Sequence, residues 1–259
     1  MKIIITDKKK REYFVSLFQV LKNCSSIINI TIGFDEFYIQ GMDKSHICLF
    51  DVKINKKWFN QFDIKEEIKI SFDSNVFHSI ISTKNDNQDL IIMMEENANP
   101  DIVHIIFSSQ EAKKGEFKKT FKMNLIDYDY QEMAIPVVDY DAEFSLSSKQ
   151  ITDMFNQLSN FGNDILIQCS EDDIRLTTNG TNGEMRVDIP IDDLTSYSIV
   201  ESQVVSLCYS LLYINKMCIT NKLSNEIDFS LSNDCPMKIN YNLGDDSSLI
   251  FFIAPKLND

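Results

Sequence analysis

The second half of this chain repeats the layout of the first half, and this repeat limits the possible folds more than any other feature. An alternating apolar stretch at 27–32, followed by an acidic turn, returns 137 residues later at 164–169. Pro100 and Pro236 match at a shift of 136, and each precedes another alternating stretch. Solenoid repeats have periods of about 20 to 50 residues, so the longer period indicates two duplicated domains.

Each half predicts a helix, several short strands, a shorter helix and further strands. In the first half we expect helices over 8–24 and 74–82, and strands near 27–32, 36–40, 46–54, 66–71, 89–95 and 102–108. The large share of alternating strand favours antiparallel sheets with helices on one face. We therefore predict an α+β fold with two similar domains, 1–124 and 144–259, joined by an interdomain connector at 125–143.

The predicted connector is unusually apolar and aromatic for a linker. It contains the sequence DYDY at 127–130 and MAIPVV at 133–138. A solvated linker does not require such side chains. We therefore expect this segment to lie on the protein or to present these groups to another molecule.

The charge and cysteine content exclude several classes of protein. Acidic residues number 39 against 25 basic ones, and the net charge is −14, so the general surface cannot coat DNA and any DNA contact must be local. The six cysteines never form a CxxC pair and are expected to be reduced core residues of an intracellular protein. No apolar run reaches about 18 residues, and the first apolar stretch is too short for a signal peptide, so we expect no membrane partner.

The motifs of catalysis and metal binding are missing from the sequence. The three histidines, at 46, 78 and 104, do not stand at metal-ligand spacing from one another or from a cysteine. There is no Gly-rich phosphate loop and no nucleophile elbow. We therefore predict a binding or scaffold protein that is not an enzyme and has no cofactor or metal.

Four segments carry a resemblance to a known family. The sequence GMDKSHICL at 41–49 resembles the GMDxSH segment of the proliferating cell nuclear antigen (PCNA) family of sliding DNA clamps. The sequence FFIAPKL at 251–257 looks like the final strand and tail of that family. Residues 133–136 are similar to its connector, and 211–215 to its last helix. The four segments occur in the family's order, and the duplication agrees with them independently.

The resemblance implies a sliding clamp, that is, a DNA polymerase processivity factor. Three chains of this family form a homotrimer, a closed ring of six domains whose inner helices surround double-stranded DNA without regard to sequence. The ring tethers DNA polymerase and other PIP-box-type proteins of replication and repair, and a clamp loader places it on DNA. A tether raises the local concentration of a weakly held partner. The expected location is the nucleus, or another intracellular site of DNA replication.

The resemblance also assigns basic residues to the DNA-facing surface. These are Lys8, Lys9, Lys10, Arg11, Lys22, Lys84, Lys149, Lys216 and Lys222. The second half departs from the family's pattern, because Asp153, Asn156 and Asn160 stand where basic residues are usual, and Leu212 replaces an arginine. On the shorter helix of the first half, Ser79 and Ser82 also stand at expected lysines. We therefore expect either a weaker positive field at the DNA-facing surface or other basic residues turned toward it.

Two further sites follow from the resemblance. The partner-peptide pocket is expected to contain Met42, His46, Ile47, Leu49, Met133, Ile135, Pro136, Pro236, Phe252, Ile253, Ala254 and Pro255. The subunit interface is expected to pair a strand at 116–123 with one at 183–189 of the next chain, with contributions from Lys118, Lys119, Phe121, Leu158, Phe161, Glu184 and Asp188. Opposite charges on two edge strands suit this pairing.

Two other hypotheses remain open at this point. The reduced number of basic residues expected on the DNA-facing surface is compatible with a monomeric processivity factor. It is also compatible with one subunit of a heteromeric checkpoint-type clamp. The third hypothesis is an enzyme or an unrelated two-domain β protein, which the absent motifs and the ordered segments disfavour.

Overall fold

The computed structural model describes residues 1–83, 87–95, 99–109, 111 and 114–256. The chain divides into two compact units, each of which contains both helices and antiparallel strands. The first unit comprises Met1–Gly41, Asp51–Met133 and Leu243–Ser248. The second comprises Met42–Phe50, Ala134–Asn242 and Leu249–Asp259. The boundaries predicted at 124/125 and 143/144 remain a prediction.

The first half of the chain contains two helices and nine strands among its described residues. The elements are β1 (Lys2–Ile5), α1 (Lys8–Cys24), β2 (Ile27–Ile32), β3 (Glu36–Met42), β4 (Cys48–Asn55), the short 3-10 helix η1 (Lys56–Trp58), β5 (Gln61–Asp63), β6 (Ile68–Asp73), α2 (Ser74–Ile81), β7 (Asp89–Met93), β8 (Ile102–Ser108) and β9 (Lys119–Asn124). The helix predicted at 8–24 is confirmed, as are the strands predicted up to residue 108 to within a few residues. Strands β1 and β5 were not predicted.

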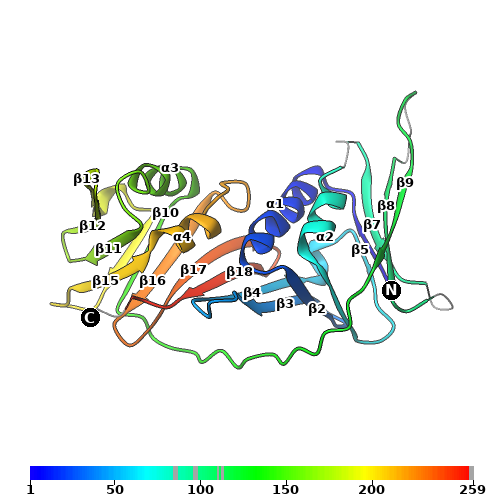
Figure 1. Ribbon diagram of the computed structural model, residues 1–259, viewed down its shortest axis with the longest axis horizontal. Coiled ribbons are helices and arrows are strands. Elements are labelled where there is room, and N and C mark those ends of the chain that lie inside the picture. Colours follow the sequence, from blue (N-terminus) through cyan, green and yellow to red (C-terminus); the bar gives the residue numbers. More distant parts are fainter. Residues whose placement is uncertain (84–86, 96–98, 110, 112–113, 257–259) are drawn as a thin grey trace. The chain divides into compact units, whose positions relative to one another are not determined.

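Two groups of strands and two helices build the first unit. One sheet has the order β5-β1-β7-β8-β9, and strands β4-β3-β2-β6 are hydrogen-bonded in that order. Helices α1 and α2 lie side by side over this second group (Figure 1). Phenylalanine rings from α1, α2 and β6 pack against one another. The ring centroids are 4.5 Å apart for both Phe18–Phe77 and Phe72–Phe77. The apolar stripe of α1 thus supplies the core of the unit.

The second half of the chain repeats this arrangement. Its elements are β10 (Ala142–Ser147), α3 (Ser148–Leu158), β11 (Asp164–Cys169), β12 (Asp173–Gly180), β13 (Gly183–Pro190), η2 (Ile191–Asp193), β14 (Ser196–Ile199), β15 (Val205–Ser210), α4 (Leu211–Met217), β16 (Glu226–Ser232), β17 (Cys235–Gly244) and β18 (Ser247–Ile253). Strands β14-β10-β16-β17-β18 are neighbours in that order, and the other sheet runs β13-β12-β11-β15. Helices α3 and α4 pack against each other and against these strands.

The predicted duplication is confirmed element by element. Strands β2 and β11 begin at 27 and 164, β3 and β12 at 36 and 173, and helices α2 and α4 at 74 and 211. Each difference is 137 residues, the shift that the sequence pattern gives. The predicted α+β class, with antiparallel sheets and helices in each half, is also confirmed.

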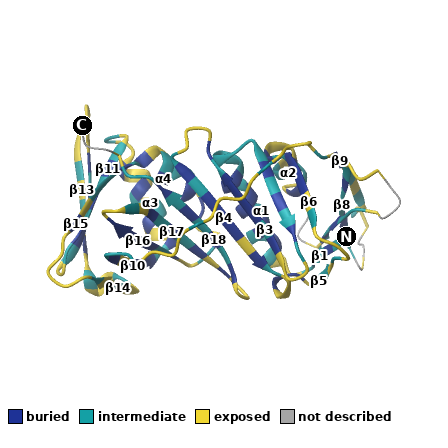
Figure 2. Cartoon of the chain, turned by 90° about the horizontal axis from the view of Figure 1, so that it is seen from below, coloured by how far each residue is buried: buried dark blue, intermediate teal, exposed yellow. Residues whose placement is uncertain are grey.

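The segment at 125–139 forms no helix or strand and is largely exposed, as its yellow colouring in Figure 2 shows. Val137 is 101% exposed and Tyr128 is 50% exposed. Its first part is nevertheless fixed to the first unit, because Thr31 Oγ1 donates to Glu132 Oε1 at 2.9 Å. The expectation that the connector lies on the protein is therefore confirmed for this first part.

Candidate functional site

The start of α1 gathers lysines on an exposed helix end. Asp7 caps the helix, because its Oδ1 accepts the backbone N–H of Lys10 at 2.8 Å, and this carboxylate offsets the helix dipole that the cations oppose. Lys8 and Lys9 are exposed, and the Lys9 ammonium lies 5.5 Å from the centre of the Tyr13 ring. Both remain available at the protein surface for the predicted DNA contact.

Arg11 does not belong to this exposed group, so the prediction that it faces DNA is wrong. Its side chain is 3% exposed, and its guanidinium donates to the Thr6 carbonyl and lies 3.7 Å from an oxygen of Asp89. Arg11 lies one turn before Phe14 on the buried stripe of the helix. Its guanidinium therefore interacts with groups of its own chain and does not face solvent.

The remaining basic residues of the first unit are partly engaged within the protein. Lys10 donates from Nζ to the Trp58 carbonyl at 2.8 Å and to Asp245 Oδ2 at 2.6 Å. Lys22 donates from Nζ to His78 Nδ1 at 3.1 Å. Burial and the nearby Lys22 charge both lower the pKa of His78, so the ring stays neutral at pH 7 and adds no positive charge. Lys84 lies outside the described residues.

The second unit offers few basic residues on its helices. Lys149 is exposed near the start of α3, while Asp153 and Asn156 are also exposed on that helix. Lys216 of α4 lies 5.1 Å from the centre of the Tyr213 ring, and Lys222 is exposed in the loop beyond it. Among the described helices, α1 therefore carries more basic residues than α3 or α4.

The GMDKSH sequence forms a tight turn between β3 and β4. Asp43 organises it, because its carboxylate accepts the backbone N–H groups of Ser45, Ile47 and Cys48 at 2.9, 2.8 and 2.7 Å. Burial raises the pKa of the Asp43 carboxyl, but these backbone donors outweigh it and the net pKa is lowered. His46 adopts φ 57° in this turn, and its side chain is exposed.

Hydrogen bonds bring together the segments of the predicted peptide pocket that belong to the second unit. The Ala254 N–H donates to the Ile47 carbonyl at 3.0 Å, which joins the final strand region to the turn. The Tyr140 hydroxyl reaches the Pro236 carbonyl at 3.5 Å, which joins the end of the connector to the same unit. The turn thus adjoins the final strand region, and the end of the connector adjoins the start of β17; a single pocket formed by all these segments remains a prediction.

Most of the residues assigned to this pocket are half-buried or exposed. Met42, Ile47, Leu49, Ile135, Phe252, Ala254 and Pro255 are partly exposed, and His46, Pro136 and Pro236 are exposed. Ile253 is 0% exposed because its side chain enters the core between its neighbours on β18, so its assignment to the pocket is wrong. Met133, at the end of the first unit, is 36% exposed.

Gln40 is a site residue that the sequence pattern did not reveal. It is 2% exposed, and its side-chain amide binds the connector at Tyr130 and Met133. Tyr38 beside it donates from its hydroxyl to Asp51 Oδ2 at 2.6 Å, and burial together with that bond raises the pKa of the Tyr38 phenol. The sequence showed only a glutamine in a strand whose other face is apolar. That pattern did not indicate which residue Gln40 would bind.

The two strands predicted to form the subunit interface lie at sheet edges. Strand β9 ends one sheet beside β8, and β13 ends another beside β12. Phe121 and Phe161 are partly exposed, Lys118 and Glu184 are exposed, and Lys119 donates from Nζ to the Thr83 carbonyl at 3.0 Å. Each of these edges retains one side that no strand of the described chain covers.

Two residues assigned to this interface interact within their own chain. Leu158 is 0% exposed within the second unit, so it offers no surface to a neighbour and its assignment is wrong. Asp188 is exposed on β13, where it lies 2.9 Å from Arg175 Nε and 2.8 Å from Arg186 Nη2, and these bonds lower the pKa of its carboxyl. The assignment of Asp188 to the interface remains a prediction.

Other chemistry is not apparent in the described part of the chain. No group of three or more His, Cys, Asp or Glu residues there could hold a metal ion, and none of the six cysteines is in a disulfide. Three of these cysteines are buried and three are only half-buried. Within the same residues, no helix has both the length and the apolar character needed to cross a membrane.

Comparison with known proteins decides the family. Residues 9–132 match the family described as "Proliferating cell nuclear antigen, N-terminal domain", and residues 134–256 match "Proliferating cell nuclear antigen, C-terminal domain". This chain belongs to the PCNA family of DNA sliding clamps. PCNA clamps are processivity factors and not enzymes, so the prediction of a non-enzymatic sliding clamp is confirmed by family membership.

Individual relatives agree over nearly the whole chain. The chain is 25% identical to "Proliferating cell nuclear antigen 2" of Plasmodium falciparum over 256 residues, covering 96% of this chain and 97% of the relative. It is 26% identical to "Proliferating cell nuclear antigen" of Chaetomium thermophilum over 229 residues, covering 85% of each. The fold is similar to the "PCNA2-PCNA3 complex from Sulfolobus tokodaii", with a TM-score of 0.87, 19% identity and 99% coverage of both chains.

Proposed function

We propose that this clamp acts as a closed homotrimeric ring of six domains around double-stranded DNA. The observation that carries this proposal is the pair of one-sided sheet edges, β9 and β13, in a chain of the PCNA family. An open edge is a site for strand pairing, and head-to-tail pairing of two different edges closes a ring. Partly exposed Phe121 on one edge and Met185 and Val187 on the other supply apolar contacts.

Encirclement explains how a chain with a net charge of −14 works on DNA. A ring is retained by topology, so weak and sequence-independent phosphate contacts are sufficient. Lys8 and Lys9 are the strongest candidates for these contacts, because both are exposed at the start of α1. Lys22, Lys149, Lys216 and Lys222 are further candidates, with Lys10 held partly by Asp245.

The partners are proposed to bind the apolar surface of the second unit, which the turn at 42–49, the connector from Ile135 and the end of β18 form together. A polymerase or another replication or repair protein inserts a PIP-box-type turn, with one aliphatic and two aromatic side chains, against Ile47, Leu49 and Phe252. Exposed apolar residues on a connector are explained when partners bury them. A clamp loader places the ring on DNA, and the proposed location is the nucleus.

A heteromeric ring is the second candidate, and the charges at the edges favour it. Lys118, Lys119 and Lys122 lie on or next to β9, while on β13 the Asp188 charge is already matched by Arg175 and Arg186. Glu184 is then the one unmatched carboxylate that β13 offers to three lysines. An acidic β13 edge on a different subunit fits those lysines better than the edge of this chain does.

Light scattering on the purified chain separates the candidates. A homotrimer has a mass of about 90 kDa, three times the chain mass of 29.9 kDa. A mass of about 30 kDa overturns the homotrimer and leaves a heteromeric ring or a monomeric factor. The encircling function is tested by loading the protein onto circular and linearised DNA with a clamp loader. A ring stays on the circle and leaves the open ends of the linear DNA, whereas equal loss from both contradicts encirclement.

A further inference from the structure

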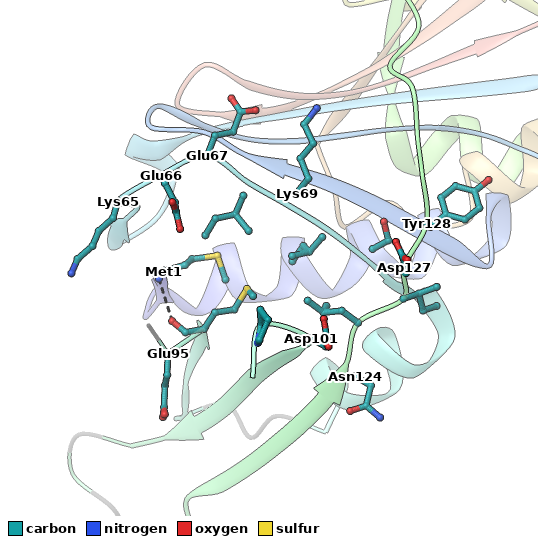
Figure 3. Close-up of a pocket in the computed structure, with 17 residues that line it drawn as sticks. Met1, Lys65, Glu66, Glu67, Lys69, Glu95, Asp101, Asn124, Asp127 and Tyr128 are labelled. Atoms are coloured by element: carbon teal, nitrogen blue, oxygen red, sulfur yellow. Dashed lines mark hydrogen bonds between the residues drawn. The ribbon is translucent and has the colours of Figure 1, made fainter. Parts of the chain in front are cut away.

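A wide cleft opens within the first unit, beside the start of the connector. Its volume is about 1220 Å³, and it lies between β6 and the ends of β7 and β9 (Figure 3). Met1 and Met94 both line it, and the Met1 amino nitrogen donates to the Met94 carbonyl at 3.2 Å. Ile68, Ile70 and Leu125 are further apolar lining residues. These five apolar side chains, called the floor below, belong to a lining that is otherwise mostly polar.

The rim of the cleft is acidic. Glu66, Glu67, Glu95, Asp101 and Asp127 line it, against Lys65, Lys69 and the amino group of Met1 (Figure 3). A second hollow of about 370 Å³ shares Lys69, Ile70, Ser71, Asp127 and Tyr128 with it. That hollow adds the carboxylates of Asp129 and Glu132. The two hollows thus adjoin at β6 and the connector, and together they are called the groove; carboxylates outnumber cations in its lining.

Strand β6 presents an open edge to this groove. It is the last strand of its sheet and pairs only with β2 among the described strands. The Ser74 N–H donates to the Ser26 carbonyl at the β2 side, whereas the Ser71 carbonyl accepts from Ile126 at 2.7 Å on the other side. Because backbone groups alternate in direction along an antiparallel strand, Lys69 directs its N–H and C=O into the groove. The groove therefore has an acidic rim and a β6 edge at which Ser71 is already bonded to the connector, while Lys69 directs backbone groups toward an added strand.

We propose that this groove binds an extended basic segment of a partner protein, which adds as a strand to the edge of β6. Strand addition supplies backbone hydrogen bonds, and alternate side chains of the added strand point to opposite faces. Aliphatic side chains on one face reach the floor at Met94 and Leu125. Lysine or arginine side chains on the other face reach the carboxylates of the rim. Nucleic acid and acidic segments do not fit, because the rim repels them.

A short synthetic peptide in which lysine and valine alternate is a direct probe. We expect it to bind the full-length protein at low salt, to shift the backbone amide signals of 67–71 and 125–128 in NMR spectra, and to weaken at least about tenfold between 50 and 200 mM salt. A peptide of the same composition with all its valines in one block controls for general attraction to an acidic protein. Failure of the alternating peptide to bind, or equal binding of both peptides, overturns the proposal.

Methylation of peptide amides tests strand addition without altering the protein. One isomer carries N-methyl groups on the valines and the other on the lysines, so the two have the same composition and charge. Only one set of amides can face β6, and we expect one isomer to lose at least about tenfold in affinity while the other binds like the parent. Equal affinity of the two isomers overturns pairing with the edge.

Charge reversal tests the location. Glu67→Lys with Glu95→Lys changes the two walls of the groove, and we expect at least about tenfold weaker binding of the alternating peptide. Asp192→Lys with Asp193→Lys, on exposed η2, makes the same change in net charge elsewhere and should preserve binding. Both variants should unfold at the wild-type temperature and keep their affinity for a PIP-type peptide. Equal weakening by the two pairs would place the peptide on the general acidic surface and overturn the site.

Discussion

The side-chain amide of Gln40 binds both backbone polar groups of Met133. Its Nε2 donates to the Met133 carbonyl at 2.9 Å, and its Oε1 accepts the Met133 N–H at 2.7 Å. The same Oε1 accepts from the Tyr130 hydroxyl at 2.7 Å, and Nε2 also reaches the Tyr38 hydroxyl at 3.0 Å. A buried amide with four partners fixes its surroundings, because each partner loses a bond when the amide is removed. Gln40 thus sets the position of the connector at its first anchored point.

Gln40→Ala should release this part of the connector. We expect a loss of about 1–3 kcal/mol in the free energy of unfolding, because the polar groups of Tyr130 and Met133 lose their partner. Hydrogen exchange of the Met133 amide should become faster by at least about tenfold. Gln131→Ala, at an exposed neighbouring position, is the control and should change neither quantity. Unchanged exchange at Met133 in Gln40→Ala would show that other contacts hold the connector.

Asp43→Asn should weaken the turn between β3 and β4 in a pH-dependent manner. The folded protein holds the pKa of Asp43 below its ordinary value of 3.8, so this carboxylate stabilises the fold above about pH 4 and ceases to do so as the pH falls below that value. We expect the substitution to cost about 1–2 kcal/mol at pH 7 and clearly less at pH 3.

Urea unfolding of wild type and Asp43→Asn at both pH values measures this difference. Comparing the two proteins at each pH cancels the titration of the other carboxylates. Lys44→Ala, at the exposed next residue of the turn, should leave stability unchanged at both values. An equal cost of Asp43→Asn at pH 7 and pH 3 would contradict a role for the charged form.

The sequence predicted helices and strands well where the apolar period of the segment matches the face that it buries in its own unit. The stripe of Phe14, Phe18 and Leu21 defined α1, and alternation defined β2 and its copy β11, because each element buries one face against its own unit. Arg11 was misplaced although the pattern contained the signal. It lies three residues before Phe14, on the same stripe, and its charge suggested the surface more strongly than its position indicated the core.

Contacts between distant segments could not be predicted. Gln40 lies on the opposite face of β3 from Phe37 and Ile39, and its partner Met133 is 93 residues away. The pairing of Asp188 with Arg175 depends on the register of β12 against β13, which places these two residues opposite each other. Local patterns encode which face is apolar but not which polar groups meet across it. The family resemblance therefore assigned more of the site residues than the spacing of residues in the sequence did.

Lys8 and Arg11 should behave differently although they are three residues apart. Lys8→Ala with Lys9→Ala should leave stability unchanged and reduce the slope of log affinity for DNA against log salt by about 1–2, because two phosphate contacts are lost. Arg11→Ala should lower the free energy of unfolding by about 3 kcal/mol. The Thr6 carbonyl and the Asp89 carboxylate would lose the buried guanidinium that they contact. Thermal unfolding and DNA binding at several salt concentrations measure both effects. An unchanged salt slope in the double variant would show that other cations contact DNA.

Phe121→Ala with Lys119→Glu should prevent subunit assembly if β9 forms the ring interface. Phe121 is partly exposed on the edge strand, 6.1 Å from the Phe107 ring, so the substitution removes apolar surface without opening the core. We expect sedimentation at the mass of a single chain. Phe34→Ala, which removes an aromatic ring that is 61% exposed elsewhere, should preserve the wild-type assembly. A double variant that still sediments like the wild type would place the interface on another edge.

Ile135→Ala and Ile47→Ser should each weaken a PIP-type peptide at least tenfold, or about 1.4 kcal/mol. Both side chains are partly exposed, so a peptide that buries them gains apolar contact, and most of the binding energy is concentrated in its aromatic anchors. The Ile47 carbonyl keeps its bond to the Ala254 N–H at 3.0 Å in either variant, so the backbone of the site is preserved. Val204→Ala, which shortens a side chain that is 63% exposed elsewhere, is the control and should bind like the wild type. Titration calorimetry with unchanged oligomer mass measures the effect, and equal affinity of all four proteins would remove Ile47 and Ile135 from the partner site.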